Sequence, residues 1–161
     1  MPLVIANKRI QKRGTEIRKF VSFINRKFEV PDQVHVHVLH FPCVYDSENE
    51  PAFGLFYVEE GKVHIELANE LEWYGKKQKF SKGFYLYLAL LSLAHETCHY
   101  FQFRDEKPVV ENYVDHNAHK LLQKFDSARK LPLLEANCPG LKEDLYATDP
   151  LQLLRKEAHL K

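Results

Sequence analysis

Residues 83–103 read GFYLYLALLSLAHETCHYFQF, and this stretch decides the fold that we expect. The segment is apolar nearly all round, which is typical of a helix buried in the middle of a domain. Two histidines and a glutamate, His95, Glu96 and His99, interrupt the apolar run. Such side chains are costly inside a core unless they are paired or bind a metal ion. The stretch therefore predicts a central helix with a polar site embedded in it.

The spacing of these three residues fits a metal site. Side chains at positions i and i+4 lie on one helix face, so both imidazoles can reach a single ion. Glu96 lies beside that face, where it can act as a general base without being a ligand. In a chain with nine histidines an HExxH match also arises by chance, and satisfied core histidines are the alternative interpretation. The apolar surroundings favour the metal site.

A catalytic zinc ion needs a third protein ligand and an open position for water. The candidates that follow the motif are Glu111, Asp115, His116 and His119. Pro108 suits the first turn of a second helix over about residues 108–129. If this helix folds back antiparallel on the first, facing residues have numbers that add up to about 210.

This arithmetic ranks the candidates. Glu111 stands level with His99, and Asp115 stands level with His95. His119 falls about 6 Å beyond His95 along the helix axis. We therefore predict Glu111 as the third ligand and Asp115 as the carboxylate that holds the outer nitrogen of His95.

The rest of the chain predicts a small sheet and two further helices. Apolar residues repeat at helical spacing in one segment, and two β-rich segments flank the turn Glu59–Lys62. The segments are an amphipathic helix at 7–28, a strand at 34–40, a hairpin of 53–58 and 63–67, loops at 41–51 and 68–82, an irregular stretch at 131–146 and a helix at about 150–160. We expect an α+β fold with an N-terminal helix, a small antiparallel sheet, the active-site helix, the antiparallel glutamate helix and a short C-terminal helix.

Composition limits the partners. The chain has 161 residues, 45% of them apolar, and a formal net charge of +1, which is ordinary for one globular domain without a nucleic-acid partner. Three cysteines do not suggest a disulfide framework, and no secretory signal is visible, so we expect a cytoplasmic protein. The longest apolar stretch, Phe84–Ala94, is about half of what a bilayer span needs, so no membrane partner is expected. The oligomeric state is not indicated.

The two helical motifs resemble those of the gluzincins, the thermolysin-like zinc peptidases that combine HExxH with ExxxD. The matching stretches are His95-Glu96-Thr97-Cys98-His99 and Glu111-Asn112-Tyr113-Val114-Asp115. The short spacer and the layout are closer to the compact minigluzincins and ImmA/IrrE-like peptidases. Their glutamate helix often reads ExxAxxxA; here Ala118 fits, and Val114 replaces a usually smaller residue.

This resemblance covers roughly residues 8–127 and implies a single zincin-like domain over 1–161, with 131–161 as an extension. It implies a metallopeptidase that binds one Zn²⁺ ion and hydrolyses a protein or peptide through a metal-activated water, with Glu96 as general base. Tyr113, His116 and His119 are near in sequence for stabilising the oxyanion, but none can be assigned. In zincin-like folds an edge strand pairs with the substrate, and residues 63–67 are the candidate.

Other interpretations stay open. The helix also resembles that of SprT-like proteases, which take a third histidine as ligand, and His116 could play that part. A non-catalytic module with a structural zinc would need His116 or Cys98 as fourth ligand and would not need Glu96. Cys138 could occupy the open zinc position and keep the enzyme latent. His35 and His37 alternate with valines and are expected on the solvent face of their strand.

Overall fold

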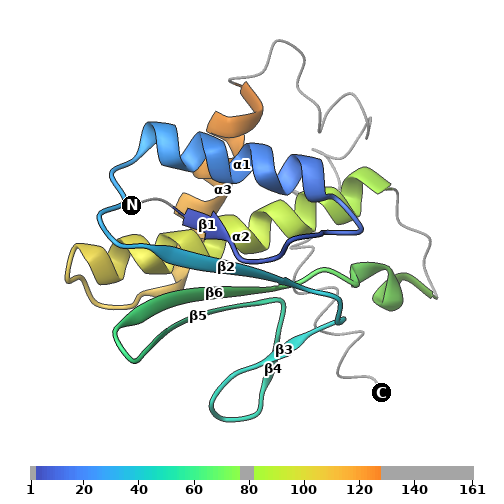
Figure 1. The fold of residues 1–161 in the computed structure, drawn as a ribbon, viewed down its shortest axis with the longest axis horizontal. Coiled ribbons are helices and arrows are strands. Elements are labelled where there is room, and N and C mark those ends of the chain that lie inside the picture. Colours follow the sequence, from blue (N-terminus) through green and yellow to red (C-terminus); the bar gives the residue numbers. More distant parts are fainter. Residues whose placement is uncertain (1–2, 77–81, 128–161) are drawn as a thin grey trace.

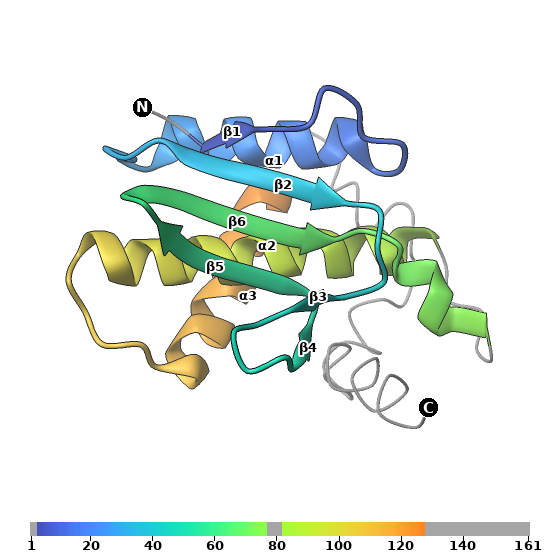
Figure 2. The same cartoon turned by 60° about the horizontal axis from the view of Figure 1, so that its bottom comes forward.

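The computed structural model describes residues 3–76 and 82–127. In this part of the chain, the helices lie on one side of a small sheet, so the class is α+β (Figures 1 and 2). The predicted irregular stretch 131–146, the predicted helix 150–160 and Cys138 lie outside the described residues.

The first half of the chain holds one α-helix and all the strands of the described residues, and the second half is helical. In chain order they are β1 (Leu3–Ile5), α1 (Gly14–Lys27), β2 (Val34–Leu39), β3 (Val44–Tyr45), β4 (Pro51–Ala52), β5 (Gly54–Glu59), β6 (Lys62–Ala68), the short 3-10 helix η1 (Leu71–Lys76), α2 (Lys82–Arg104) and α3 (Glu111–Ser127).

The main sheet is mixed, so the predicted antiparallel sheet is wrong in part. Its strand order is β1-β2-β6-β5; β1 and β6 both run parallel to β2, and only β5 is antiparallel to its neighbour. The helix α1 joins β1 to β2, and a helical crossover of this kind brings its two strands together in parallel. The short pair β3–β4 is antiparallel and lies in the segment predicted as a loop.

The strand order also corrects the predicted substrate-binding strand. Residues 63–67 belong to β6, which pairs with β2 on one side and with β5 on the other. The edge of the sheet that lies along α2 is therefore β5 (Figure 2).

Alternation along the strands separates the core from an open face. Val34, Val36 and Val38 are fully buried against the helices, whereas His35 and His37 are half-buried on the opposite face. The prediction of a half-buried strand with its histidines away from the core is confirmed. The helix α2 is buried nearly all round: it packs against β5 and β6 on one side and against α3 on the other, while α1 lies beside it on the same face of the sheet, over β1 (Figure 2).

The first helix begins at Gly14, seven residues later than predicted. Arg13 has a φ of 61°, a left-handed conformation that interrupts a right-handed helix and is unfavourable for a residue with a side chain. Its side chain compensates by binding the chain segment that follows β6. Arg13 Nε donates to Asn69 Oδ1 at 2.9 Å, and its terminal nitrogens bind the Asn69 carbonyl and the Glu72 carboxylate.

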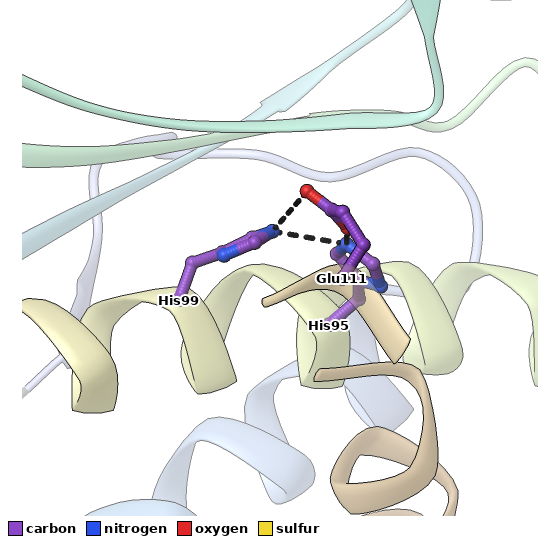
Figure 3. Close-up of side chains that lie close together, drawn as sticks. All are labelled: His95, His99 and Glu111. Atoms are coloured by element: carbon purple, nitrogen blue, oxygen red, sulfur yellow. Dashed lines mark hydrogen bonds and ion pairs between the residues drawn. The ribbon is translucent and has the colours of Figure 1, made fainter. Parts of the chain in front are cut away.

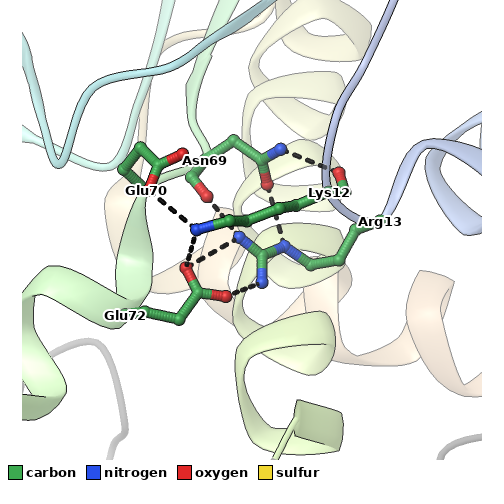
Figure 4. Close-up of polar contacts among 5 residues, drawn as sticks. All are labelled: Lys12, Arg13, Asn69, Glu70 and Glu72. Carbon is green, nitrogen blue, oxygen red and sulfur yellow. Dashed lines mark hydrogen bonds and ion pairs between the residues drawn. The ribbon is translucent and has the colours of Figure 1, made fainter.

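Figure 4 shows this group, which we call the Arg13 clasp: Lys12, Arg13, Asn69, Glu70 and Glu72. Asn69 returns a hydrogen bond to the Lys12 carbonyl at 2.9 Å, and Lys12 Nζ lies 2.9 Å from Glu70 Oε2. Burial raises the pKa of Glu72, but hydrogen bonds and the positive charges of Arg13 and Lys12 outweigh it, so the pKa lies below its ordinary value. The clasp thus ties the start of α1 to the segment that leads into η1.

The connection between α2 and α3 also differs from the prediction. Glu106 has a φ of 53°, and Lys107 N–H donates to the Gln102 carbonyl at 2.8 Å, which is the bond of a Schellman helix end. Residues 107–110 form no regular structure, and α3 begins at Glu111 instead of residue 108. Both figures show α3 crossing α2 obliquely (Figures 1 and 2).

No helix among residues 3–76 and 82–127 combines the length and the apolar character needed to cross a membrane.

The clasp predicts a difference between two neighbouring cations. Arg13→Ala leaves a buried amide and a half-buried carboxylate without their donor, and we expect a loss of about 1–3 kcal/mol in the free energy of unfolding, measured by urea denaturation at pH 7. Lys12→Ala removes only partly exposed pairs, and about 1 kcal/mol or less should be lost. Because the folded pKa of Glu72 is lowered, its contribution is present above the unfolded value of 4.5 and disappears as the pH falls through the folded value. Equal losses of unfolding free energy in Arg13→Ala and Lys12→Ala would contradict the central role of Arg13 in the clasp.

Candidate metal centre

Two histidines from α2 and one glutamate from α3 converge on a common point (Figure 3). His95 Nε2 and His99 Nε2 are 3.1 Å apart. Glu111 Oε2 lies 3.3 Å from the first nitrogen, and Glu111 Oε1 lies 3.4 Å from the second. Among the described residues, these are the ones that form a group of three or more ligand-type side chains with potential to hold a metal ion.

The separations fit a small ion bound by nitrogen and oxygen. In a tetrahedral site with bonds of about 2.0–2.1 Å, neighbouring ligand atoms are about 3.3–3.4 Å apart. The separation of the two nitrogens, 3.1 Å, is close to this edge length, and each nitrogen has one Glu111 oxygen at 3.3 or 3.4 Å; with one ligand atom taken from each residue, all three atoms lie within 4.8 Å of one another. The donor set therefore fits a divalent metal ion, and His95, His99 and Glu111 could hold one.

The outer nitrogens of both imidazoles face oxygen atoms. Asp115 Oδ1 lies 2.9 Å from His95 Nδ1, at ion-pair distance but out of line with the N–H bond, so this nitrogen has no aligned hydrogen-bond partner. His99 Nδ1 lies 3.3 Å from Gln102 Oε1. An oxygen acceptor favours a proton on the nitrogen that faces it. When Nδ1, the outer nitrogen of each ring, carries the proton, the lone pair of the inner Nε2 is available to bind a cation.

The charge state of His95 suits metal binding. Burial and the neighbouring His99 lower its pKa, and together they outweigh the carboxylates of Asp115 and Glu111, which raise it. Metal ions bind the neutral imidazole, so a lowered pKa reduces competition from protons.

A second pair of histidines shows what an ordinary imidazole hydrogen bond looks like in this protein. His37 Nε2 and His64 Nδ1 are also 3.1 Å apart, but their rings are inclined by only 24°. The rings of His95 and His99 are inclined by 73°, and a carboxylate lies against both inner nitrogens. The pair on the sheet is a hydrogen-bonded stack, whereas the pair on α2 has the convergent arrangement of ligands.

The start of α3 places Glu111 in the first turn of a helix, where the helix dipole stabilises a negative charge. The side chains of His95 and His99 are 12% and 11% exposed, whereas that of Glu111 is 65% exposed. The centre is therefore enclosed on the α2 side and open to solvent on the α3 side. A site of this kind leaves room for a water molecule or a substrate.

Glu96 is buried against the first residue of the edge strand. A Cβ atom added to Gly54 would lie 2.8 Å from Glu96 Cγ and 2.9 Å from its Oε1. Real Cβ atoms do not approach other atoms this closely, so the Glu96 side chain has its present position because residue 54 is glycine. The edge strand and the HExxH helix are thus in direct contact at the predicted general base.

The structure brings together most of the residues predicted from the sequence. His95, His99 and Glu111 form the group, and Asp115 contacts His95 as expected. His119 instead forms a hydrogen bond of 2.9 Å with the hydroxyl of Tyr87.

The alternative ligands do not join the group. His116 is exposed on α3 and outside the three-residue group. Cys98 is buried, and burial, followed by the charge of Glu96, raises its pKa to about 12. Tyr113 lines a hollow with Cys98 and Phe101 on the side of α2 away from the edge strand.

Two residues of the site were not predicted. Gln102 lies three positions after His99, a spacing that puts both on one helix face and could have identified it. Gly54 gives no local signal, because its role depends on which strand forms the edge of the sheet.

No protein-family model, curated protein or solved structure matches this chain.

The contact with Gln102 predicts a loss of metal affinity. Gln102→Ala removes the acceptor that orients His99, and we expect affinity for Zn²⁺ to fall by about 10- to 100-fold in a competition titration with a chromophoric chelator. Gln123→Ala, which changes an exposed glutamine on α3, should leave the affinity unchanged. If both variants bind zinc with the affinity of the wild type, Gln102 does not orient His99 for metal binding.

Proposed function

We propose that this protein is a zinc-dependent metallopeptidase. The observation that carries the proposal is the convergence of two imidazoles and a carboxylate on one point, with a further carboxylate, the buried Glu96, on the same helix as the histidines. A structural metal site needs the ligands but has no use for Glu96. The open side at Glu111 also favours a catalytic site over a closed structural one.

In this proposal His95, His99 and Glu111 hold one zinc ion. Zinc is favoured by the mixed imidazole and carboxylate donors and by the 3.1 Å separation of the two imidazole nitrogens. When bound, the ion supplies Lewis acidity, which lowers the pKa of water and polarises a carbonyl group. Asp115 and Gln102 hold the two imidazoles in the orientation that ligation requires.

The chain's own contribution to hydrolysis centres on Glu96. Its carboxylate takes a proton from the attacking water and passes it to the leaving nitrogen of the peptide bond. The absence of a side chain at Gly54 leaves room for this carboxylate on the sheet side. No residue is assigned to the oxyanion.

The substrate in this proposal is a peptide in extended conformation. The strand β5 lies along α2 next to the metal centre, and within residues 3–76 and 82–127 it pairs in the sheet with β6 alone. The outer edge of such a strand binds an extended chain through main-chain hydrogen bonds. β5 thus replaces residues 63–67 as the candidate strand. The cytoplasmic location stays a prediction from cysteine usage.

The proposal predicts that metal binding and hydrolysis can be separated. Glu96→Gln should bind zinc as the wild type does but cleave casein or a peptide mixture about 100- to 10,000-fold more slowly, because only the proton acceptor is lost. Glu111→Ala should lose zinc as well as activity. Glu48→Gln, on an exposed loop, is the matched control. Zinc content by mass spectrometry and cleavage rates check these outcomes, and full activity in Glu96→Gln would refute the mechanism.

The contact of Gly54 with Glu96 predicts a second separation. Gly54→Ala pushes the flexible carboxylate aside, and we expect cleavage to slow by about 100-fold while zinc affinity stays unchanged. Gly61→Ala is the control: its φ of 74° makes alanine strained, so stability falls, but activity per folded molecule should be retained. Normal cleavage by Gly54→Ala would show that Glu96 has no fixed role.

A further inference from the structure

One face of β5 continues from the metal centre as an apolar surface. Partners in an antiparallel pair point to the same face of a sheet. The pairs Gly54–Leu67, Phe56–Ile65 and Val58–Val63 therefore all face the helices, since the β6 residues are buried there. Gly54 contacts Glu96, so Phe56 and Val58 extend this face along the strand away from the general base.

The helix α2 supplies the matching side. His95, His99 and Phe103 are spaced four residues apart, so they follow one another along one face of the helix. The ring of Phe103 lies 5.8 Å from the ring of Phe56, centroid to centroid. Phe103 is 46% exposed and Val58 is 43% exposed. Two large apolar side chains thus face solvent beside a polar site, where a ligand can cover them.

The other end of this row differs in exposure. Leu91, one helical turn before His95, is buried, with 2% of its surface exposed. Tyr87 lies one turn farther, and its hydroxyl bonds the ring of His119 at 2.9 Å. Along this face of α2, the exposed apolar side chain next to the metal centre is therefore on the Phe103 side.

We infer that Phe56, Val58 and Phe103 form a specificity subsite for a bulky aliphatic or aromatic side chain of the substrate; this inference rests on the proposed peptidase function. Phe103 lies one helical turn, about 6 Å, beyond His99. An extended peptide rises about 3.3 Å per residue. The preferred side chain lies within about two residues of the scissile bond, on one side of it only.

The first test is the cleavage pattern. Zinc-loaded wild type is incubated with a degenerate peptide mixture, and the cut positions are read by mass spectrometry. We expect Leu, Ile, Met or Phe to be enriched at one such position. Phe103→Ala should lower kcat/KM for these peptides by about 10-fold or more, with a change of less than about threefold for peptides that carry alanine there.

Two matched valine variants test whether the cleavage preference arises at β5. Val58 and Val4 are both exposed valines on the two edge strands of one sheet, at opposite edges. Val58→Ala should weaken the preference, and Val4→Ala should leave it intact. Cleavage without any apolar enrichment, or enrichment that survives in Phe103→Ala, overturns the subsite while the peptidase function stands.

The second test does not require turnover. Peptide hydroxamates bind zinc directly, and two series that extend to either side of the ion are compared with leucine or alanine in the variable position. By calorimetry, one series should bind the zinc-loaded wild type about 10-fold more tightly with leucine, and Phe103→Ala should reduce this ratio to about twofold. Equal affinity in both series overturns the subsite. A normal preference together with no cleavage of any peptide overturns the peptidase function alone.

Discussion

The polar centre of this protein brings together groups that repel one another and that a bound cation would stabilise. Two inner imidazole nitrogens and one carboxylate approach within 3.1–3.4 Å of one another. Oxygen atoms of Asp115 and Gln102 face the outer nitrogens and favour protons there. Lone pairs and a negative charge then meet at one point, which is unfavourable without a positive charge between them. The surrounding fold has to hold these groups together against that repulsion.

The fold does so by placing the ligands on well-packed elements. α2 is buried nearly all round, so the two histidines on it have little freedom to separate. α3 is fixed at its far end, where Phe125 packs against Phe20 and Phe23 of α1. The Schellman end of α2 sets the point from which α3 departs. The exposed Glu111 is the one ligand free to adapt, and it lies in the first turn of its helix.

Local periodicity explains how much of this could be predicted. The i, i+4 spacing of His95 and His99 depends on helix geometry alone, so the sequence is sufficient for that pair. The level pairing of Glu111 with His99 and of Asp115 with His95 needs only the first two turns of α3 to face α2. The pairing rule, by which facing residues of the two helices have numbers that add up to about 210, fails farther along α3. It places His119 level with Leu91, but His119 forms its hydrogen bond with Tyr87, one helical turn closer to the start of α2. α3 crosses α2 obliquely because Phe125, near the end of α3, packs against α1. The residues around Phe125 give no indication of this contact in the sequence.

The sheet was harder to predict because its strand order also depends on contacts between distant parts of the chain. β1 has only three residues, too few for alternation to be recognised, yet its crossover through α1 adds a parallel pair; β2 also pairs in parallel with β6, so the sheet is mixed. Once β2 pairs with β6, β5 is displaced to the edge beside α2. That displacement brings Gly54 against Glu96 and Phe56 against Phe103. The environment of the proposed general base therefore follows from strand order. Residue spacing within the HExxH helix predicts the candidate ligands, whereas the topology of the sheet determines what a substrate of the proposed peptidase would contact beside them.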